Sequence, residues 1–357
     1  MTRIYASLAL FASVSVAGCG SAPPAKEPAP PPPAASAAAA KPAAPEPPPA
    51  PDPETANVPL RKKGENLFAG AKLYVDVDHR VRKMADAMKA TKPAEASALD
   101  KIASQPAVEW LGGWNANIEH MGKARTAKIN EAGALATYVV YNIPNRDCGQ
   151  YSKGGVSGPD EYKRWIRALA KGIGPRRAAI ILEPDALGLL TKCLSAGDKE
   201  ARLAMLRDAV QVLEANGNTA VYIDAGNPHW MPAKDMAERL KSAGVDQADG
   251  FALNVSNYMT TAENVKYGKE ISRLVGGKHF VIDTSRNGNG ATKDFEWCNP
   301  HGRALGHKPT VDTGESLVDA FLWVKRPGES DGECNGGPKA GEFWLGMAVE
   351  LANNTKD

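Results

Sequence analysis

Short apolar runs recur between residues 72 and 325 of this chain, and segments with helical spacing separate most of them. The runs are continuous, which is typical of parallel strands buried on both faces of a sheet. We expect strands at Lys72–Val77, Thr137–Ile143, Ala178–Glu183, Thr219–Asp224, Gly250–Val255, Lys278–Thr284 and Ala320–Lys325. We expect helices at Pro159–Gly172, Asp198–Asn216, Ala233–Ser242 and Ala262–Val275, with a further candidate starting near Glu315. These units predict an α/β fold with one catalytic domain, a closed or nearly closed TIM-like parallel barrel, and an open doubly wound sheet is the alternative.

Acidic residues stand at the carboxyl ends of several expected strands. One run continues into Glu183-Pro184-Asp185, and others stop at Asp224 and Asp283, while Asp147 follows the strand that contains Tyr141. Because catalytic groups of parallel barrels lie at that end of the strands, we expect these acids to gather there. The pattern favours an enzyme that moves protons with carboxylates over a set of surface caps at strand ends.

Composition excludes several other functions. The 357 residues carry a formal net charge of +2, and no basic stretch indicates a nucleic-acid partner. We find no glycine-rich phosphate loop, and the six histidines have no metal-binding spacing. We therefore expect neither an organic cofactor nor a metal ion.

The N-terminus has the features of an export signal. Arg3 precedes an apolar run from Ile4 to Val16, which is too short to span a membrane. Small residues before Cys19 resemble a bacterial lipoprotein cleavage box, and a plain signal peptide is the alternative. We predict a signal at 1–18, a lipidated Cys19 with a Pro/Ala-rich tether at 19–57, and a catalytic domain at 58–357. The expected location is the cell surface or outer membrane, with release from the cell as the alternative.

Four cysteines remain in the expected domain, an even number in a chain expected to be exported. Four cysteines permit three pairings. We favour Cys148–Cys193 with Cys298–Cys334, because each pair would join loops at the strand ends that carry acids. Free thiols are the alternative.

Two further groups of residues complete the candidate site. Lys325, Glu329 and Asp331 lie in a loop with Pro and Gly after the last strand, where they either face a ligand or are solvated loop charges. Tryptophans in or beside polar loop sequences are candidates for stacking on sugar rings, or else they cover the barrel ends: Trp110, Trp114, Trp230 and Trp297. Together with clustered carboxylates, they favour a polysaccharide cleft.

These residues resemble glycoside hydrolase family 6, which contains endoglucanases and cellobiohydrolases that act on β-1,4-glucans. The matching segments occur in order across residues 58–357: Val139–Cys148, Glu183-Pro184-Asp185, Tyr222–Gly226, Ala252–Tyr258, Ile282–Gly290, Trp297–Pro300 and Leu322–Gly332. The resemblance implies a distorted, seven-stranded α/β barrel and hydrolysis with inversion of anomeric configuration.

The resemblance also implies roles for individual residues. Asp185 matches the catalytic acid, Asp147 the aspartate that tunes it, and Asp331 the proposed base, with a water relay through Asp147 and Ser152 as the alternative. Ser152 matches the serine that positions the water, and Tyr141 the tyrosine beneath the distorted sugar. The remaining matches to substrate-binding positions are Asp224, Asn254, Lys325, Glu329, Trp110, Trp230 and Trp297. The two favoured disulfides match those of the family.

The chain departs from the family pattern at Asn227, where members often have histidine. The loop between Asp331 and Phe343 is short, which implies an open cleft and cleavage within the glucan chain. We therefore predict a monomeric, lipid-anchored endo-β-1,4-glucanase. The alternatives are an exo-acting cellobiohydrolase and a catalytically silent glucan-binding protein at the cell surface.

Overall fold

The computed structural model describes residues 58–62 and 64–356, which belong to one compact unit. The predicted signal, Cys19 and the tether lie outside the described residues. No helix in the described part is long and apolar enough to cross a membrane.

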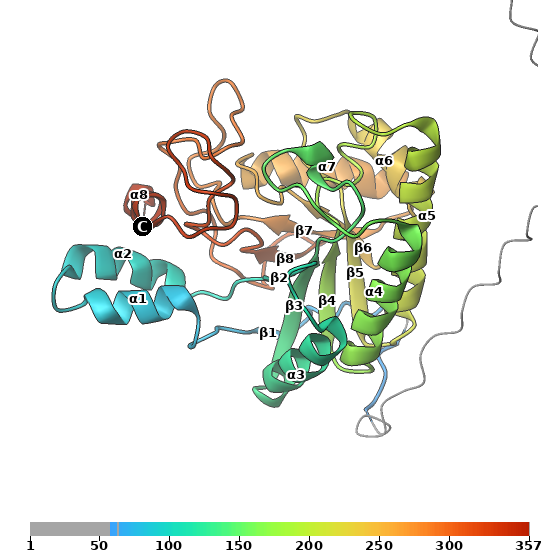
Figure 1. The fold of residues 1–357 in the computed structure, drawn as a ribbon, viewed down its shortest axis with the longest axis horizontal. Helices are drawn as coiled ribbons and strands as arrows, with labels where there is room; N and C mark the ends of the chain where they lie inside the picture. The colour runs from blue at the N-terminus through green and yellow to red at the C-terminus, as the bar shows by residue number, and fades with distance from the viewer. Residues whose placement is uncertain (1–57, 63, 357) are drawn as a thin grey trace, which may run out of the picture. The chain divides into compact units, whose positions relative to one another are not determined.

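A curved parallel sheet forms the centre of the unit (Figure 1). Its strands are β1 (Lys72–Leu73), β2 (Glu109–Leu111), β3 (Ala134–Val140), β4 (Ala178–Leu182), β5 (Thr219–Asp224), β6 (Gly250–Leu253), β7 (His279–Asp283) and β8 (Val318–Leu322). From β3 to β8 each strand pairs with the next one in sequence, always parallel. Because β1 and β2 pair with successive parts of β3, they share one strand position, and the sheet has seven strand positions. The predicted seven-stranded α/β barrel is confirmed.

The barrel is open along one seam. No strand ladder in the described residues joins β8 to β1 or β2. Instead, the backbone N–H of Val108 donates to the carbonyl of Trp323 at 3.0 Å, and the indole Nε1 of Trp110 donates to the carbonyl of Val324 at 2.8 Å. These contacts bring the end of β8 against the start of β2.

Alternating side chains of each strand serve two apolar layers, which explains the continuous apolar runs in the sequence. In β3, Leu135 and Val139 face an interior cluster, whereas Ala136, Tyr138 and Val140 pack against the surrounding helices. That outer layer is formed by α3 (Ile118–Glu131), α4 (Pro159–Ile173), α5 (Ala196–Glu214), α6 (Ala233–Ser242) and α7 (Thr261–Leu274).

Three other helices form a smaller group with its own apolar core. These are α1 (Arg80–Met88), α2 (Pro93–Ala103) and α8 (Leu345–Asn354), and they lie together beside the sheet (Figure 1). Trp323, just after β8, is buried in the same cluster. The group therefore supports the side of the barrel where the seam lies.

Several sequence predictions are wrong in detail, including the first strand, which ends at Leu73 and not at Val77. No helix starts near Glu315, because Gly314 has a φ of +71° and the N–H of Glu315 is turned toward the hydroxyl of Thr313. The last strand ends at Leu322 and not at Lys325, since the N–H groups of Val324 and Lys325 donate to the carboxylate of Asp283. The sequence analysis also missed β2, α1, α2, α3 and α8.

Candidate active site

A cleft of about 750 Å³ lies at the carboxyl ends of the strands. Eleven residues singled out in the sequence line it: Trp110, Trp114, Tyr141, Asp147, Ser152, Asp185, Trp230, Trp297, Lys325, Glu329 and Asp331. Trp110 lies in β2, and the others come from the segments after β2, β3, β4, β5, β7 and β8. The predicted gathering of strand-end acids is therefore observed for Asp147 and Asp185, which the loop acids Glu329 and Asp331 join.

Asp185 occupies the turn that follows β4. Its backbone has a φ of +69°, and its N–H donates to the Oδ2 atom of the buried Asp224 at 3.0 Å. Its own carboxyl remains partly exposed to the cleft, with the hydroxyl of Tyr141 at 3.4 Å from Oδ2. The turn thus directs one carboxyl into the cleft and buries the other beneath it.

The electrostatics around Asp185 favour a protonated carboxyl near neutral pH. Burial, followed by the negative charge of Asp147, raises the pKa of Asp185 to about 7. Burial also raises the pKa of Asp147, although the N–H of Ser152 and the charge of Arg146 oppose this effect. A carboxyl that still holds its proton near pH 7 can act as a general acid.

Buried groups hold the loop that carries Asp147. The carboxylate of Glu183 accepts the N–H groups of Asn142 and Ile143 at 2.9–3.1 Å, where the chain leaves β3. Arg202 donates to two carbonyls of the same loop, and the disulfide between Cys148 and Cys193 ties the loop to the segment after β4. The predicted pairing is present, as is Cys298–Cys334.

Asp331 has surroundings that contrast with those of Asp185. One guanidinium nitrogen of Arg286 contacts both carboxylate oxygens, at 2.8 and 3.0 Å, and Lys325 lies 3.5 Å away. Tyr258 and the N–H of Asn299 also donate to Oδ2. Burial raises the pKa of Asp331, but the charges of Arg286 and Lys325 outweigh it, so the pKa lies below its usual value. Asp331 is therefore ionised and weakly basic.

The aromatic residues give the cleft flat apolar walls. Trp114, Trp230 and Trp297 are 53%, 37% and 42% exposed. Trp110 lies near the end of β2, beside the loop that follows it, with its ring edge-on to Tyr141 at 5.4 Å. Exposed rings beside clustered carboxyls suit a polysaccharide ligand, whose sugar rings have apolar faces.

Two predicted sugar-binding residues lie under the cleft and are buried. Asp224 accepts the N–H groups of Asp185 and Gly226. Asn254 uses its side chain to hold the loop after β6, with its amide donating to the carbonyls of Met259 and Asp283. The geometry assigns both residues to the support of the cleft floor, in place of the predicted sugar contacts.

Sequence reasoning missed the cations that organise the carboxylates. Arg286 holds Asp331, and Arg146 lines the cleft beside Asp147. Both follow strands within a few residues, so the rule that located the acids could have found them. Gln150, Tyr151 and Lys153 also line the cleft without having been predicted.

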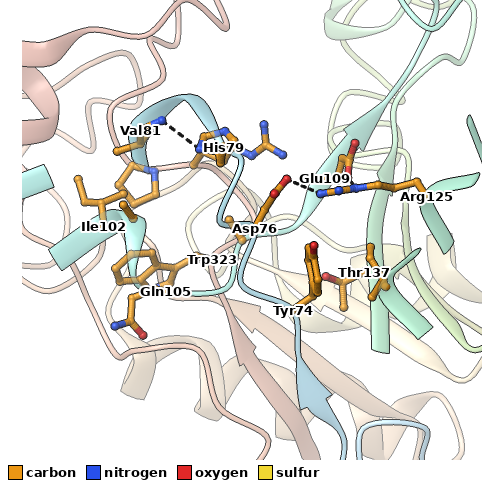
Figure 2. A pocket seen from close by; sticks show the side chains of 15 residues that line it. Tyr74, Asp76, His79, Val81, Ile102, Gln105, Glu109, Arg125, Thr137 and Trp323 are labelled. Carbon is orange, nitrogen blue, oxygen red and sulfur yellow. Dashed lines mark hydrogen bonds and ion pairs between the residues drawn. The ribbon is translucent and has the colours of Figure 1, made fainter. Parts of the chain in front are cut away.

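A second, much smaller pocket lies behind Arg326, which also lines the cleft. Its volume is about 40 Å³, room for a few water molecules. Figure 2 shows Arg125 beside Asp76 and Glu109 in this pocket, and both carboxylates are ion-paired with the guanidinium. This pocket is too small for a sugar ring, and its charged groups already pair with one another. Within residues 58–62 and 64–356, no group of three or more His, Cys, Asp or Glu side chains is arranged to hold a metal ion.

Comparisons with known proteins agree with this geometry. The family model described as "Glycosyl hydrolases family 6" matches residues 68–355. Endoglucanase A of Cellulomonas fimi is 47% identical over 76% of this chain, and endoglucanase 1 of Streptomyces halstedii is 42% identical over 78%. The aligned regions cover 59% and 87% of those proteins, respectively, so this chain spans well under two thirds of the first.

A solved structure of the endoglucanase Cel6 from Mycobacterium tuberculosis, bound to a thio-linked cello-oligosaccharide, superimposes with a TM-score of 0.78. That protein is 43% identical, and the alignment covers 81% of this chain and 99% of the other. On the match to the family model and on these identities, the chain belongs to glycosyl hydrolases family 6.

Proposed function

We propose that this protein is an endo-β-1,4-glucanase that cleaves β-1,4-glucan with inversion of anomeric configuration. The observation that carries the proposal is the open, aromatic-lined cleft into which Asp185 directs a carboxyl with a raised pKa. In the mechanism, Asp185 donates its proton to the glycosidic oxygen as the C–O bond breaks. A water molecule attacks the anomeric carbon from the opposite face, so that the product has the inverted configuration.

Asp147 and Asp331 assist this step in different ways. The charge of Asp147 keeps Asp185 protonated, and Asp147 lies beside Ser152, whose N–H donates to it at 2.7 Å. The ionised Asp331 stabilises positive charge that develops on the sugar. Since its pKa is depressed, it is a weak acceptor for the proton of the attacking water. We therefore favour a relay in which that proton leaves through Asp147 and Ser152.

Endo action follows from the architecture of the loop after β8. The loop folds onto its own base: the N–H of Ser330 donates to the carbonyl of Glu342 at 2.9 Å, and that of Trp344 donates to the carbonyl of Gly328 at 2.7 Å. The disulfide between Cys298 and Cys334 adds a further restraint. We infer that a loop this short leaves the cleft open, so that a glucan can enter along its length.

The test combines viscosity and reducing-end release on carboxymethylcellulose, with Asp185→Ala as the inactive control. We expect a fast loss of viscosity per bond cut, abolished in the variant while glucan binding is retained. Slow loss of viscosity with release of cellobiose would favour an exo-acting enzyme. Near-normal turnover by the variant would refute the mechanism, and NMR of the first product should show the α-anomer.

Export through a lipid anchor is a separate part of the proposal. Arg3, the apolar run from Ile4 to Val16 and the small residues before Cys19 support it. The expected result is palmitate labelling of the full chain and recovery in the membrane fraction, both lost in Cys19→Ser. A labelled Cys19→Ser variant would exclude this anchor. We also propose a monomer, which light scattering can test.

A further inference from the structure

Arg146 forms the centre of a stack of planar groups at the edge of the cleft. Its guanidinium carbon lies 4.8 Å from the ring centre of Tyr141 and 5.2 Å from that of Trp114. In the plane of the guanidinium, Nη1 donates to the carbonyl of Tyr141 at 2.7 Å and Nε to the carbonyl of Ser152 at 2.8 Å. The hydrogen bonds thus fix the guanidinium within its plane, and the two aromatic rings fix it perpendicular to that plane.

Trp114 is the outer member of this stack. It is the most exposed of the three exposed tryptophans that line the cleft, at 53%. Gly112 approaches it so closely that a Cβ atom there would lie 2.5 Å from the indole ring. One side of the ring is therefore supported, and more than half of the side chain remains free in a cleft that takes a ligand.

We propose that Trp114 is a further sugar-stacking platform, and that Arg146 supports it as a positioning residue. The ligand is a glucosyl unit of the β-1,4-glucan, stacked on the indole ring of Trp114. This inference rests on the proposed function. A rigid ring loses little conformational entropy when a sugar binds, so the support by Arg146 and Gly112 strengthens stacking.

Trp114 could instead serve only to cover Arg146 and so to hold the loop that carries Asp147. The two roles predict different kinetics. Loss of a binding platform changes which bond of a long oligosaccharide is cut, because the chain binds in a different register. If Trp114 only covers Arg146, its loss loosens the loop that carries Asp147 and slows every cleavage alike. The pH profile then also shifts, since the charge of Asp147 raises the pKa of Asp185.

The experiment compares Trp114→Ala and Trp114→Phe with the full-length protein on reducing-end-labelled cellohexaose. For Trp114→Ala we expect KM to rise about tenfold, with a changed distribution of cleavage sites and an unchanged pH profile. Trp114→Phe should recover most of the affinity. Phe295→Ala is the matched control, because Phe295 is 47% exposed but lies outside the residues that line the cleft.

An unchanged cleavage distribution, with or without slower turnover, would overturn the proposal. Calorimetry of cellohexaose binding in the Asp185→Asn background separates this failure from that of the proposed function. If the wild type hydrolyses no β-glucan but the Trp114→Ala change weakens cellohexaose binding about tenfold, the platform stands and the enzymatic assignment fails. Unchanged binding in that background would also overturn the platform.

Discussion

The two ends of the barrel each hold a cluster of carboxylates with unusual pKa values, but in the described part of the chain the large cleft lies at the carboxyl end. At the carboxyl end, Asp185 faces an open cleft and its pKa is about 7. At the amino end, burial and a hydrogen bond that the protonated Glu214 donates to Asp249 raise the pKa of Glu214 to about 9. A raised pKa therefore does not distinguish catalysis from architecture here. The distinction lies in access, since Glu214 and Asp249 are both ion-paired with the buried guanidinium of Arg61.

The amino-end cluster fastens the segment before β1 to the barrel. Arg61 bonds to Glu214, Asp249 and the carbonyl of Thr219. Close by in the same segment, Asn66 donates to Asp319, which also accepts from Tyr222 at 2.6 Å and contacts His279 at 2.7 Å. These charges are neutralised from within the chain, as expected for groups that serve stability.

The largest contrast should come from paired isosteric changes at the two ends. Asp185→Asn removes the proton donor and should lower kcat by a factor on the order of 10³ without changing Tm. Glu214→Gln should leave kcat on carboxymethylcellulose within about twofold, because the barrel separates it from the cleft. Steady-state kinetics with thermal melts checks both. A comparable loss of kcat in the two variants would mean that the amino-end cluster also contributes to catalysis.

Arg61→Ala should be the most destabilising change at the amino end. It leaves Glu214 and Asp249 without their cation, and breaking such a pair costs on the order of 3–5 kcal/mol. The exposed Arg207 on α5 is the control: its pair with Glu200 should contribute less than about 1 kcal/mol. Urea unfolding of both alanine variants measures the difference. Equal stabilities would mean that the segment around Arg61 is not a structural strap.

The parts of this fold that were predictable have strong local signals. The strands from β3 to β8 are buried on both faces, so their apolar runs are continuous, and an acid marks the end of β5 and of β7. By contrast, α3 buries small or polar residues such as Gly122 and Thr126 against its neighbours, which weakens the apolar pattern of that helix. The strand β2 has only three residues, too few for a period to be visible.

The sequence predicts which residues gather at the site, but it does not predict which of them a ligand can reach. Strand ends place Asp224 and Asp185 at the same edge of the sheet. Whether a carboxyl faces the cleft or a backbone N–H depends on the path of the turn after the strand. The positive φ values of Glu183 and Asp185 create that path, and no sequence period reveals them.

Asp147→Asn should change the pH dependence of the reaction. The negative charge of Asp147 helps to raise the pKa of Asp185, so its removal lowers that pKa. The acid must be protonated, and kcat/KM should therefore begin to fall at a lower pH than in the wild type. The whole profile should also be lower if Asp147 relays a proton. A pH–rate profile with a soluble substrate tests this, and an unshifted alkaline limb would exclude the electrostatic role.

The smallest effect should appear in the pH dependence of stability, and it originates at the amino end. The pKa of Glu214 is raised from 4.5 to about 9 in the folded state, so the folded protein retains a proton that the unfolded chain releases. Its contribution to stability is complete below the unfolded pKa and is lost as pH rises toward 9. Tm of the wild type should therefore fall by a few degrees between pH 5 and pH 9 relative to Glu214→Gln.

The amide mimics the protonated acid, because it can donate to Asp249 and accept the N–H of Val221 as Glu214 does. Glu200→Gln changes an exposed acid on the same helix and should follow the wild type. If Tm of Glu214→Gln fell with pH as much as Tm of the wild type, Glu214 would not hold a proton in the folded protein. The two clusters would then differ in protonation as well as in access.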